Sequence, residues 1–246
     1  MIQVQGLAKH YGNFVAVQDL DFAVAPGEIL GLVGPNGAGK TTTLRCLVGI
    51  LTPTAGAVAI DGHDLRTDTV EAKRALAWLP DEPHLFEYLT VREHLALTAR
   101  LYGVEGAIER GKALLEELEL TEKADVLPGE LSRGMKQKLA IACGLLHEPR
   151  ALFFDEPLTG LDPAGMRRMK NVMRRLARDG AAVILSSHLL SLVEEVCTHL
   201  LVLKNGRKIA DGSVEEVRQR FGANEEDSLE DVFFRATGEA EEAAPP

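Results

Sequence analysis

The sequence has few cysteines and no long apolar run, and each absence excludes a class of protein. Cys46, Cys143 and Cys197 are far apart and odd in number, so they form neither a disulfide framework nor a zinc-ligand pattern. The longest stretch without a polar side chain is 139–146, whereas a bilayer-spanning helix needs about 18 apolar residues. No basic start followed by an apolar stretch marks a secretory signal. We therefore expect a chain that works in a reducing compartment and does not itself cross a membrane.

Basic charge is also scarce. The 246 residues include 27 Lys and Arg against 37 Asp and Glu, which gives a net charge of −10. Most of it lies at one end, since 225–246 contain eight acidic residues and one basic residue. A near-neutral body with an acidic end lacks the basic surface that the nucleic-acid backbone requires, so we expect no nucleic-acid partner. We expect the acidic extension 223–246 to finish in a disordered, solvated stretch rich in Glu, Ala and Pro.

What the sequence does contain is an alternation of strand-like and helix-like segments. Alternating apolar residues predict half-buried antiparallel strands near 2–4, 15–24 and 57–60. Continuous apolar runs predict parallel strands buried on both faces, and they lie at 29–33, 151–154, 181–185 and 200–203. Helical spacing marks 166–176 and 189–196, and the middle of the chain, about 90–146, has helical periodicity and no clear strand. We expect an α/β fold with an antiparallel N-terminal part and an inserted helical segment.

A glycine-rich loop follows the predicted strand at 29–33. It fits the pattern G-x-x-x-x-G-K-[ST], with the residues Gly34, Pro35, Asn36, Gly37, Ala38, Gly39, Lys40 and Thr41. The glycines let successive N–H groups point at phosphate oxygens, and the following helix N-terminus adds positive potential. Lys40 can reach the β- and γ-phosphates, Thr41 can ligate magnesium, and Thr42 lies near the α-phosphate. A glycine turn that merely caps a helix is the weaker interpretation, because both flanking elements are present.

Two carboxylates, Asp155 and Glu156, end the apolar strand at 152–154. Open α/β sheets bind ligands at the carboxyl ends of their strands. We expect Asp155 to hold magnesium and Glu156 to act as the general base that polarises the attacking water. Alone, such a pair is more often the start of a loop, but together with the phosphate loop it favours a catalytic site.

A second candidate anion site precedes the predicted helix at 135–146. Ser132 is a good helix N-cap, and that role alone is one interpretation. The other is that the Ser132 hydroxyl, the Gly134 N–H and the helix N-terminus together bind phosphate. Asp162 followed by Pro163 predicts a further helix start.

The order of these motifs, ending in Ser187-His188, closely resembles the nucleotide-binding subunit of ATP-binding-cassette (ABC) transporters over about 2–221. The resemblance implies a P-loop NTPase core with an antiparallel N-terminal β subdomain and an inserted helical subdomain. It implies a single domain at 1–222, with its core at 1–81 and 149–222 and the helical insertion at about 82–148. The implied activity is magnesium-dependent ATP hydrolysis.

The resemblance also assigns roles to residues. Tyr11 matches the aromatic residue that stacks on adenine, although a tyrosine packed on a turn explains it equally well. Ser132 and Gly134 would bind the γ-phosphate held by the opposite protomer of a head-to-tail dimer, formed with a second copy or a related cassette. His188 would contact the γ-phosphate, and 158–162 would link the two sites.

Three positions depart from the family pattern. Asp81 stands where the family usually has glutamine; a carboxylate can ligate magnesium or water but donates no hydrogen bond unless protonated. Residues 131–135 match the signature motif of the family, and there Arg133 replaces a glycine and Met135 a glutamine. Because Lys40, Glu156 and His188 fill the catalytic positions, we expect active hydrolysis.

Transport by a chain without a span requires a separate integral membrane permease subunit, which places this chain at the cytoplasmic face of the membrane. The resemblance puts the docking site near 81–90, where Leu85, Phe86 and Tyr88 are candidate anchors. They could equally pack the inserted helices. The segment 229–234 resembles the end of export-type subunits, or is simply an amphipathic helix.

Two other functions stay open. ABC ATPases that act on DNA or ribosomes usually have tandem cassettes or long insertions, and this chain has neither. A regulatory module that binds ATP without hydrolysing it remains an alternative because of Asp81 and Arg133. The transported substrate cannot be read from this chain, since the residues that select it would lie in the membrane partner.

Overall fold

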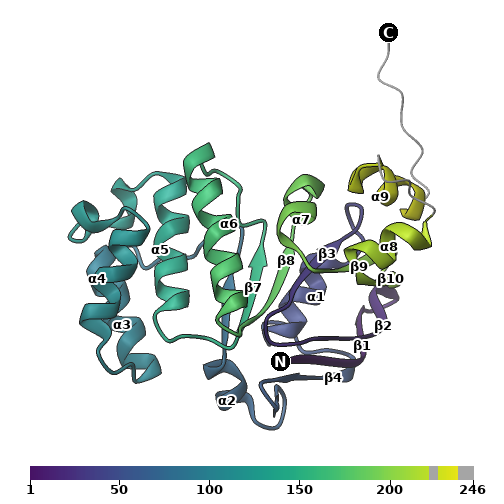
Figure 1. Ribbon diagram of the computed structural model, residues 1–246. Coiled ribbons are helices and arrows are strands. Elements are labelled where there is room, and N and C mark those ends of the chain that lie inside the picture. The colour runs from purple at the N-terminus through teal and green to yellow at the C-terminus, as the bar shows by residue number, and fades with distance from the viewer. Residues whose placement is uncertain (222–226, 238–246) are drawn as a thin grey trace.

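The computed structural model describes residues 1–221 and 227–237, which form two sheets and the helices around them (Figure 1). The strands are β1 (Ile2–Tyr11), β2 (Phe14–Val24), β3 (Ile29–Val33), β4 (Ala55–Ile60), β5 (His63–Asp64), β6 (Leu76–Leu79), β7 (Ala151–Asp155), β8 (Ala182–Ser186), β9 (His199–Lys204) and β10 (Arg207–Ser213). The helices are α1 (Lys40–Leu47), α2 (Thr69–Arg74), α3 (Val91–Tyr102), α4 (Ala107–Glu117), α5 (Arg133–Leu145), α6 (Pro163–Arg178), α7 (Leu190–Val196), α8 (Val214–Arg220) and α9 (Leu229–Thr237), with short 3₁₀ turns η1 (Thr121–Lys123) and η2 (Pro128–Glu130). Within the described ranges, none of these helices combines the length and the apolar character that a bilayer crossing demands.

The N-terminal sheet is antiparallel, with the strand order β2-β1-β4-β5. Its alternating sequence places apolar side chains such as Ile2, Val4 and Ile60 on the inner face, where they are fully or almost fully buried. This confirms the antiparallel strands predicted from the alternating pattern.

The larger sheet has the order β10-β9-β3-β8-β7-β6, and all neighbours except β10 and β9 are parallel. Side chains on its strands alternate between two apolar cores; for example, Phe153 enters one and Phe154 the other, and both are fully buried. Burial on both faces explains why these strands appear as continuous apolar runs. The sequence pattern did not reveal β6 or β10: β6 is only four residues long, and β10 is an edge strand rich in polar residues.

The two cores define the layers. One core lies between the two sheets and surrounds α1, which contributes Leu44 and Leu47. The other lies on the opposite face of the large sheet and is covered by α5, α6 and α7 (Figure 1). The large sheet therefore lies between the two apolar cores. The carboxyl ends of its parallel strands β3, β7 and β8 meet at one edge.

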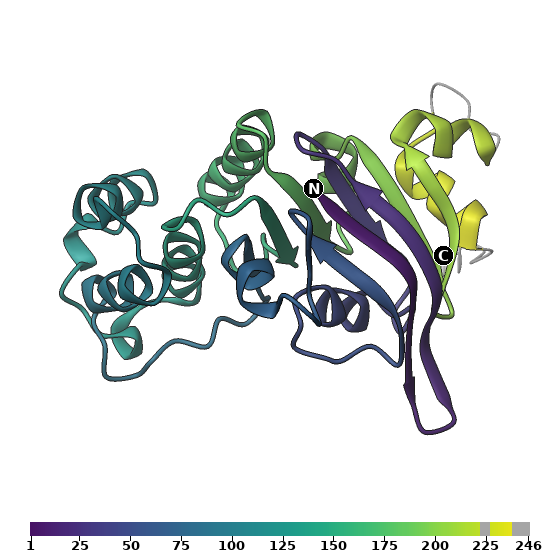
Figure 2. The same cartoon turned by 90° about the horizontal axis from the view of Figure 1, so that it is seen from below.

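Residues 82–148 contain α3, η1, η2, α4 and α5, and no strand. They lie at one end of the molecule, beyond the edge strand β6 (Figure 2). The side chains of Glu117 and Glu119 form ion pairs with Arg175 and Arg168 of α6, which link this helical segment to the core. Thr90 begins α3 with a capping box completed by Glu93.

At the C-terminal end, α8 and α9 pack beside α7, with Leu229 and Val232 buried. The amphipathic helix considered for 229–234 is confirmed as α9. The disordered stretch expected at the acidic end lies in 238–246, outside the described residues, as do 222–226.

Candidate functional site

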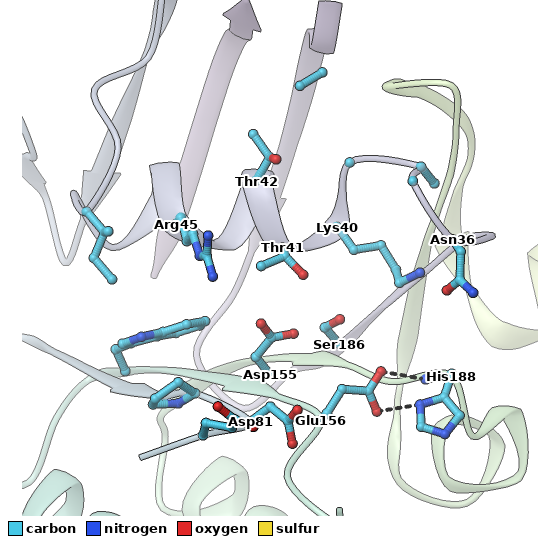
Figure 3. A pocket seen from close by; sticks show the side chains of 18 of the residues that line it. Asn36, Lys40, Thr41, Thr42, Arg45, Asp81, Asp155, Glu156, Ser186 and His188 are labelled. Atoms are coloured by element: carbon cyan, nitrogen blue, oxygen red, sulfur yellow. Dashed lines mark hydrogen bonds and ion pairs between the residues drawn. The ribbon is translucent and has the colours of Figure 1, made fainter. Parts of the chain in front are cut away.

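An open cleft of about 1050 Å³ lies where the phosphate loop, the ends of β7 and β8 and the segment after β6 come together (Figure 3). A cleft of this size can hold a nucleoside triphosphate. Its walls are formed by Phe14, Ala16, Asn36, Gly37, Ala38, Gly39, Lys40, Thr41, Thr42, Arg45, Ile50, Trp78, Pro80, Asp81, Glu82, His84, Asp155, Glu156, Ser186 and His188. Gly34 and Pro35 line a smaller adjoining cavity of about 340 Å³, together with Phe233 of α9.

The phosphate loop depends on its glycines. Gly39 has φ of +101°, and a Cβ there would lie 2.5 Å from the Ala16 carbonyl oxygen, so no other residue fits without displacing the β2 backbone. α1 begins at the next residue, Lys40, whose ammonium donates hydrogen bonds to the carbonyls of Gly34 (2.5 Å) and Pro35 (3.1 Å). The helix N-terminus and this ammonium make the loop an anion-binding site.

Thr41 and Asp155 approach the cleft from opposite walls (Figure 3). Asp155 is only 8% exposed, and this burial raises the pKa of its carboxyl. The negative charges of Glu156 and Asp81 raise that pKa further, whereas a hydrogen bond from Ser186 lowers it. A hydroxyl facing a carboxylate suits Mg²⁺, which prefers oxygen ligands and keeps several waters. No group of three or more His, Cys, Asp or Glu in the described part of the chain could hold a metal by itself, so water and phosphate would have to complete the coordination.

Glu156 is held in one orientation by the loop after β8. Its Oε1 accepts a hydrogen bond from the His188 N–H (3.0 Å), and its Oε2 lies 2.8 Å from His188 Nδ1 (Figure 3). The Ser187 hydroxyl contacts the same Oε2 at 3.4 Å. The Glu156 backbone has φ of +51°, a left-handed conformation that costs on the order of 1 kcal/mol and is concentrated at functional sites. The turn after β7 is therefore strained so that the carboxylate faces the cleft.

The signature residues lie elsewhere. Ser132 caps α5, and its hydroxyl accepts a hydrogen bond from the Met135 N–H at 3.3 Å, as predicted. Neither Ser132 nor Gly134 lines the cleft of its own chain. Asp81 does line it, and its Oδ1 lies 3.1 Å from Nη2 of Arg133, the residue between the two.

Of the two aromatic residues at the β1–β2 hairpin, Phe14 lines the cleft and Tyr11 does not. Tyr11 lies at the end of β1 and does not line the cleft; the Lys9 ammonium lies 5.1 Å from its ring centroid. Phe14, its partner across the β1–β2 hairpin, does line the cleft and is 64% exposed. Sequence reasoning also missed Trp78, Arg45 and His84. An exposed aromatic residue beside the hairpin turn was the available signal for Phe14; the other three reach the cleft only through the tertiary fold.

Comparisons with known proteins agree with this geometry. A family model described as ABC transporter matches residues 17–159. The chain is 34% identical over 241 residues to the ABC-type transporter ATP-binding protein EcsA of Bacillus subtilis (strain 168), covering 97% of each. It is 40% identical over 214 residues to a Nod factor export ATP-binding protein I of Burkholderia pseudomallei (strain 1710b), covering 86% of this chain and 70% of that protein.

Solved structures show the same relationship. One described as the ATP-binding subunit of an ABC transporter superimposes with a TM-score of 0.91 at 35% identity, covering 96% of this chain and 99% of the other. A nucleotide-free ATP-binding cassette from an ABC transporter superimposes with a TM-score of 0.76 at 25% identity, covering 89% and 94%. The P-loop α/β architecture, the cleft and these matches together establish that the chain belongs to the ABC transporter family, as one of its ATP-binding subunits.

Proposed function

We propose that this chain is the magnesium-dependent, ATP-hydrolysing subunit of an export-type ABC transporter. The observation that carries the proposal is the Glu156 carboxylate, oriented by His188 across the cleft from Lys40. A general base held within reach of a bound γ-phosphate is what hydrolysis requires beyond simple nucleotide binding. The cassette would comprise 1–222, with a core at 1–81 and 149–222 and the helical segment 82–148 inserted between them.

Each residue then has a chemical task. The N–H groups of the phosphate loop and Lys40 bind the phosphates, and Thr42 lies beside them. Thr41 and Asp155 would hold Mg²⁺, with Asp81 as a third candidate ligand. When bound, the ion neutralises charge on the β- and γ-phosphates. Glu156 accepts the proton of the attacking water, while Lys40 and His188 stabilise the charge of the transferring phosphoryl group.

The position of the signature residues supports a head-to-tail dimer. Ser132 is exposed at the N-terminus of α5 and lies outside its own cleft. In a second copy or a related cassette, Ser132 and Gly134 would close over the γ-phosphate bound by the first. Part of the binding energy of ATP would then drive closure of the dimer, and hydrolysis would reopen it.

The loop before α3 supports docking of a separate membrane permease, which would place the chain at the cytoplasmic face of the membrane. Tyr88 and Phe86 are 87% and 60% exposed, whereas Leu85 packs against the core. Buried His94 fixes the loop: its Nε2 accepts from the Phe86 N–H (3.0 Å), and its Nδ1 donates to the Thr90 carbonyl (2.8 Å). The two exposed rings suit an interface, where aromatic residues are enriched.

The docking site predicts an uncoupled variant. Tyr88→Ala should leave the ATPase activity and Tm of the isolated chain unchanged and reduce ATP-driven transport by the reconstituted complex at least about tenfold, as for the loss of an interface anchor. Ile108→Ala, at another exposed apolar residue of the helical segment, is the matched control. A loss of stability in Tyr88→Ala would instead mean that the ring packs the inserted helices.

Glu156→Gln tests the catalytic proposal. The substitution removes the base and keeps the size, so phosphate release should fall on the order of 10²–10⁴-fold while an ATP-bound dimer accumulates. Steady-state phosphate release and size-exclusion chromatography with ATP and magnesium measure both effects. Glu122→Gln, at an exposed carboxylate of η1, is the control. Unchanged turnover in Glu156→Gln would show that Glu156 is not the general base. ATP binding without turnover in the wild type would favour a regulatory module that does not hydrolyse ATP.

A further inference from the structure

Two of the three departures from the family pattern, Asp81 and Arg133, contact each other. Asp81 and Arg133 are 52 residues apart in the sequence, yet Arg133 Nη2 lies 3.1 Å from Asp81 Oδ1. A carboxylate stands where the family has a neutral amide, and a guanidinium stands where it has a glycine. The two replacements therefore introduce opposite charges that neutralise each other within one chain.

The surrounding structure holds Arg133 in place. Its aliphatic stem packs against Gly160. A Cβ added at Gly160 would lie only 2.9 Å from Arg133 Cδ and 3.2 Å from Cγ. One turn further along α5, the buried Gln137 donates a hydrogen bond from Nε2 to the Pro80 carbonyl, next to Asp81. Two side chains of α5 thus reach the segment 80–81, and the loop at Gly160 closes over the Arg133 stem.

The cleft makes the charge of Asp81 costly to nucleotide binding. Asp81 lines it together with three other carboxylates, Glu82, Asp155 and Glu156. These groups interact, since the charge of Asp81 contributes to the raised pKa of Asp155. ATP would add further negative charge to the same cleft, and like charges repel each other. Arg133 does not line the cleft and reaches Asp81 from α5.

We propose that Arg133 is a positioning residue for nucleotide binding, which pairs with Asp81 of its own chain and offsets the extra carboxylate in the ATP cleft. The signature end of α5 thereby acts on the nucleotide site of the same chain, in addition to any role in a partner. The inference rests on the proposed function only in taking MgATP as the ligand. It assigns Asp81 and Arg133 to one compensating pair.

A double-mutant cycle on equilibrium binding of MgATP tests the pair. The proteins are the wild type, Arg133→Ala, Asp81→Asn and the double variant, each titrated at low ionic strength and saturating magnesium. Arg133→Ala should weaken binding about threefold to fivefold, the range of a partly exposed ion pair. When Asp81→Asn is already present, Arg133→Ala should change the dissociation constant less than about 1.5-fold. Each comparison changes residue 133 and keeps residue 81 the same. Any direct effect of Asp81 on magnesium binding is therefore present in both proteins and cancels in the ratio of their dissociation constants.

Ionic strength and a charge-conserving substitution distinguish an electrostatic role of Arg133 from a packing role. The penalty of Arg133→Ala should shrink at high ionic strength, because salt screens a partly exposed pair. Arg133→Lys keeps the charge and should restore binding to within about twofold of the wild type. Arg92→Ala, which breaks the Arg92–Asp125 pair in the helical segment, is the matched control and should leave binding unchanged.

Two outcomes would overturn the proposal. An equal penalty for Arg133→Ala with and without Asp81→Asn would mean that Arg133 acts through its contact with Gly160. No penalty at all would mean that the pair has no bearing on nucleotide binding. If Arg133→Ala fails to fold, Arg133→Gln, which keeps a stem over Gly160, takes its place in the cycle. The cycle measures nucleotide affinity, whereas the Glu156→Gln experiment measures phosphate release and dimer formation, so failure of the hydrolytic function would appear separately.

Discussion

The aromatic wall of the cleft leads to a sharp prediction, because two neighbouring aromatic residues compete for the role of adenine platform. Phe14 lines the cleft, whereas Tyr11 does not and lies beside the Lys9 ammonium. We expect Phe14→Ala to weaken MgATP binding and Tyr11→Ala to leave it nearly unchanged.

The magnitude follows from the exposed area of the ring. A phenylalanine presents roughly 200 Å², and Phe14 is 64% exposed, which leaves about 130 Å² accessible. A stacked base covers one face, about half of that area, and at about 25 cal/mol per Å² this contributes about 1.5 kcal/mol. Base–aromatic stacking is worth about 1–3 kcal/mol per base, in agreement. The expected loss in Phe14→Ala is therefore about tenfold in the dissociation constant.

Titration of the Glu156→Gln protein with MgATP, monitored by calorimetry, measures this loss without interference from hydrolysis. Phe14→Leu serves as a control for apolar contact without a ring and should recover only part of the affinity. Thermal denaturation of each variant excludes a general loss of structure, since both side chains are exposed at a hairpin. If Tyr11→Ala lowers affinity more than Phe14→Ala does, the assignment from the cleft lining is wrong and the family resemblance identifies the platform correctly.

Two further predictions concern stability. Burial raises the pKa of Asp155 in the folded state, so the folded chain takes up a proton more readily than the unfolded chain and the ionised carboxylate destabilises the fold at neutral pH. Asp155→Asn should therefore raise the Tm at pH 7, and this advantage should vanish below about pH 4, where the carboxyl is protonated in both states. ATPase activity should be lost. A lower Tm at pH 7 would contradict this. Asp162→Ala should remove the N-cap hydrogen bond of 2.7 Å to the Gly165 N–H, costing about 1 kcal/mol. Asp162→Asn should keep most of that stability, and equal Tm values for the two variants would rule out the cap.

The fold could be predicted as far as side-chain periodicity determines it. The buried strands β3, β7, β8 and β9 are continuous apolar runs because each contributes to two cores. Asp162 and Ser132 mark helix starts because their side chains accept hydrogen bonds from backbone N–H groups three residues later. The strand β6 could not be predicted from periodicity, because four residues are too few to show one. These residues form a strand only through their pairing with β7.

The candidate site likewise has residues that local sequence could predict and residues that it could not. The phosphate loop and the pair Asp155 and Glu156 were predictable because local chain geometry, a glycine turn or a strand end, creates them. Trp78 and Arg45 were not, since each reaches the cleft from a different element and has no local mark in the sequence, and Phe14 had only its place beside the hairpin turn as a signal. The contact between Arg133 and Asp81 likewise depends on how α5 packs beside the segment that follows β6.

The contact between Glu156 and His188 joins two groups to which the proposed mechanism gives catalytic roles. His188 Nδ1 lies 2.8 Å from the carboxylate and must carry a proton to donate to it. In a neutral imidazole the other nitrogen, Nε2, is then an acceptor and repels a phosphate oxygen. In the proposed mechanism Nε2 donates to a phosphate oxygen only when both ring nitrogens carry protons or after Nδ1 has released Glu156. With the proposed roles, binding of the γ-phosphate would change either the protons on His188 or its hydrogen bond to Glu156, and the His188 ring would link Glu156 to the nucleotide.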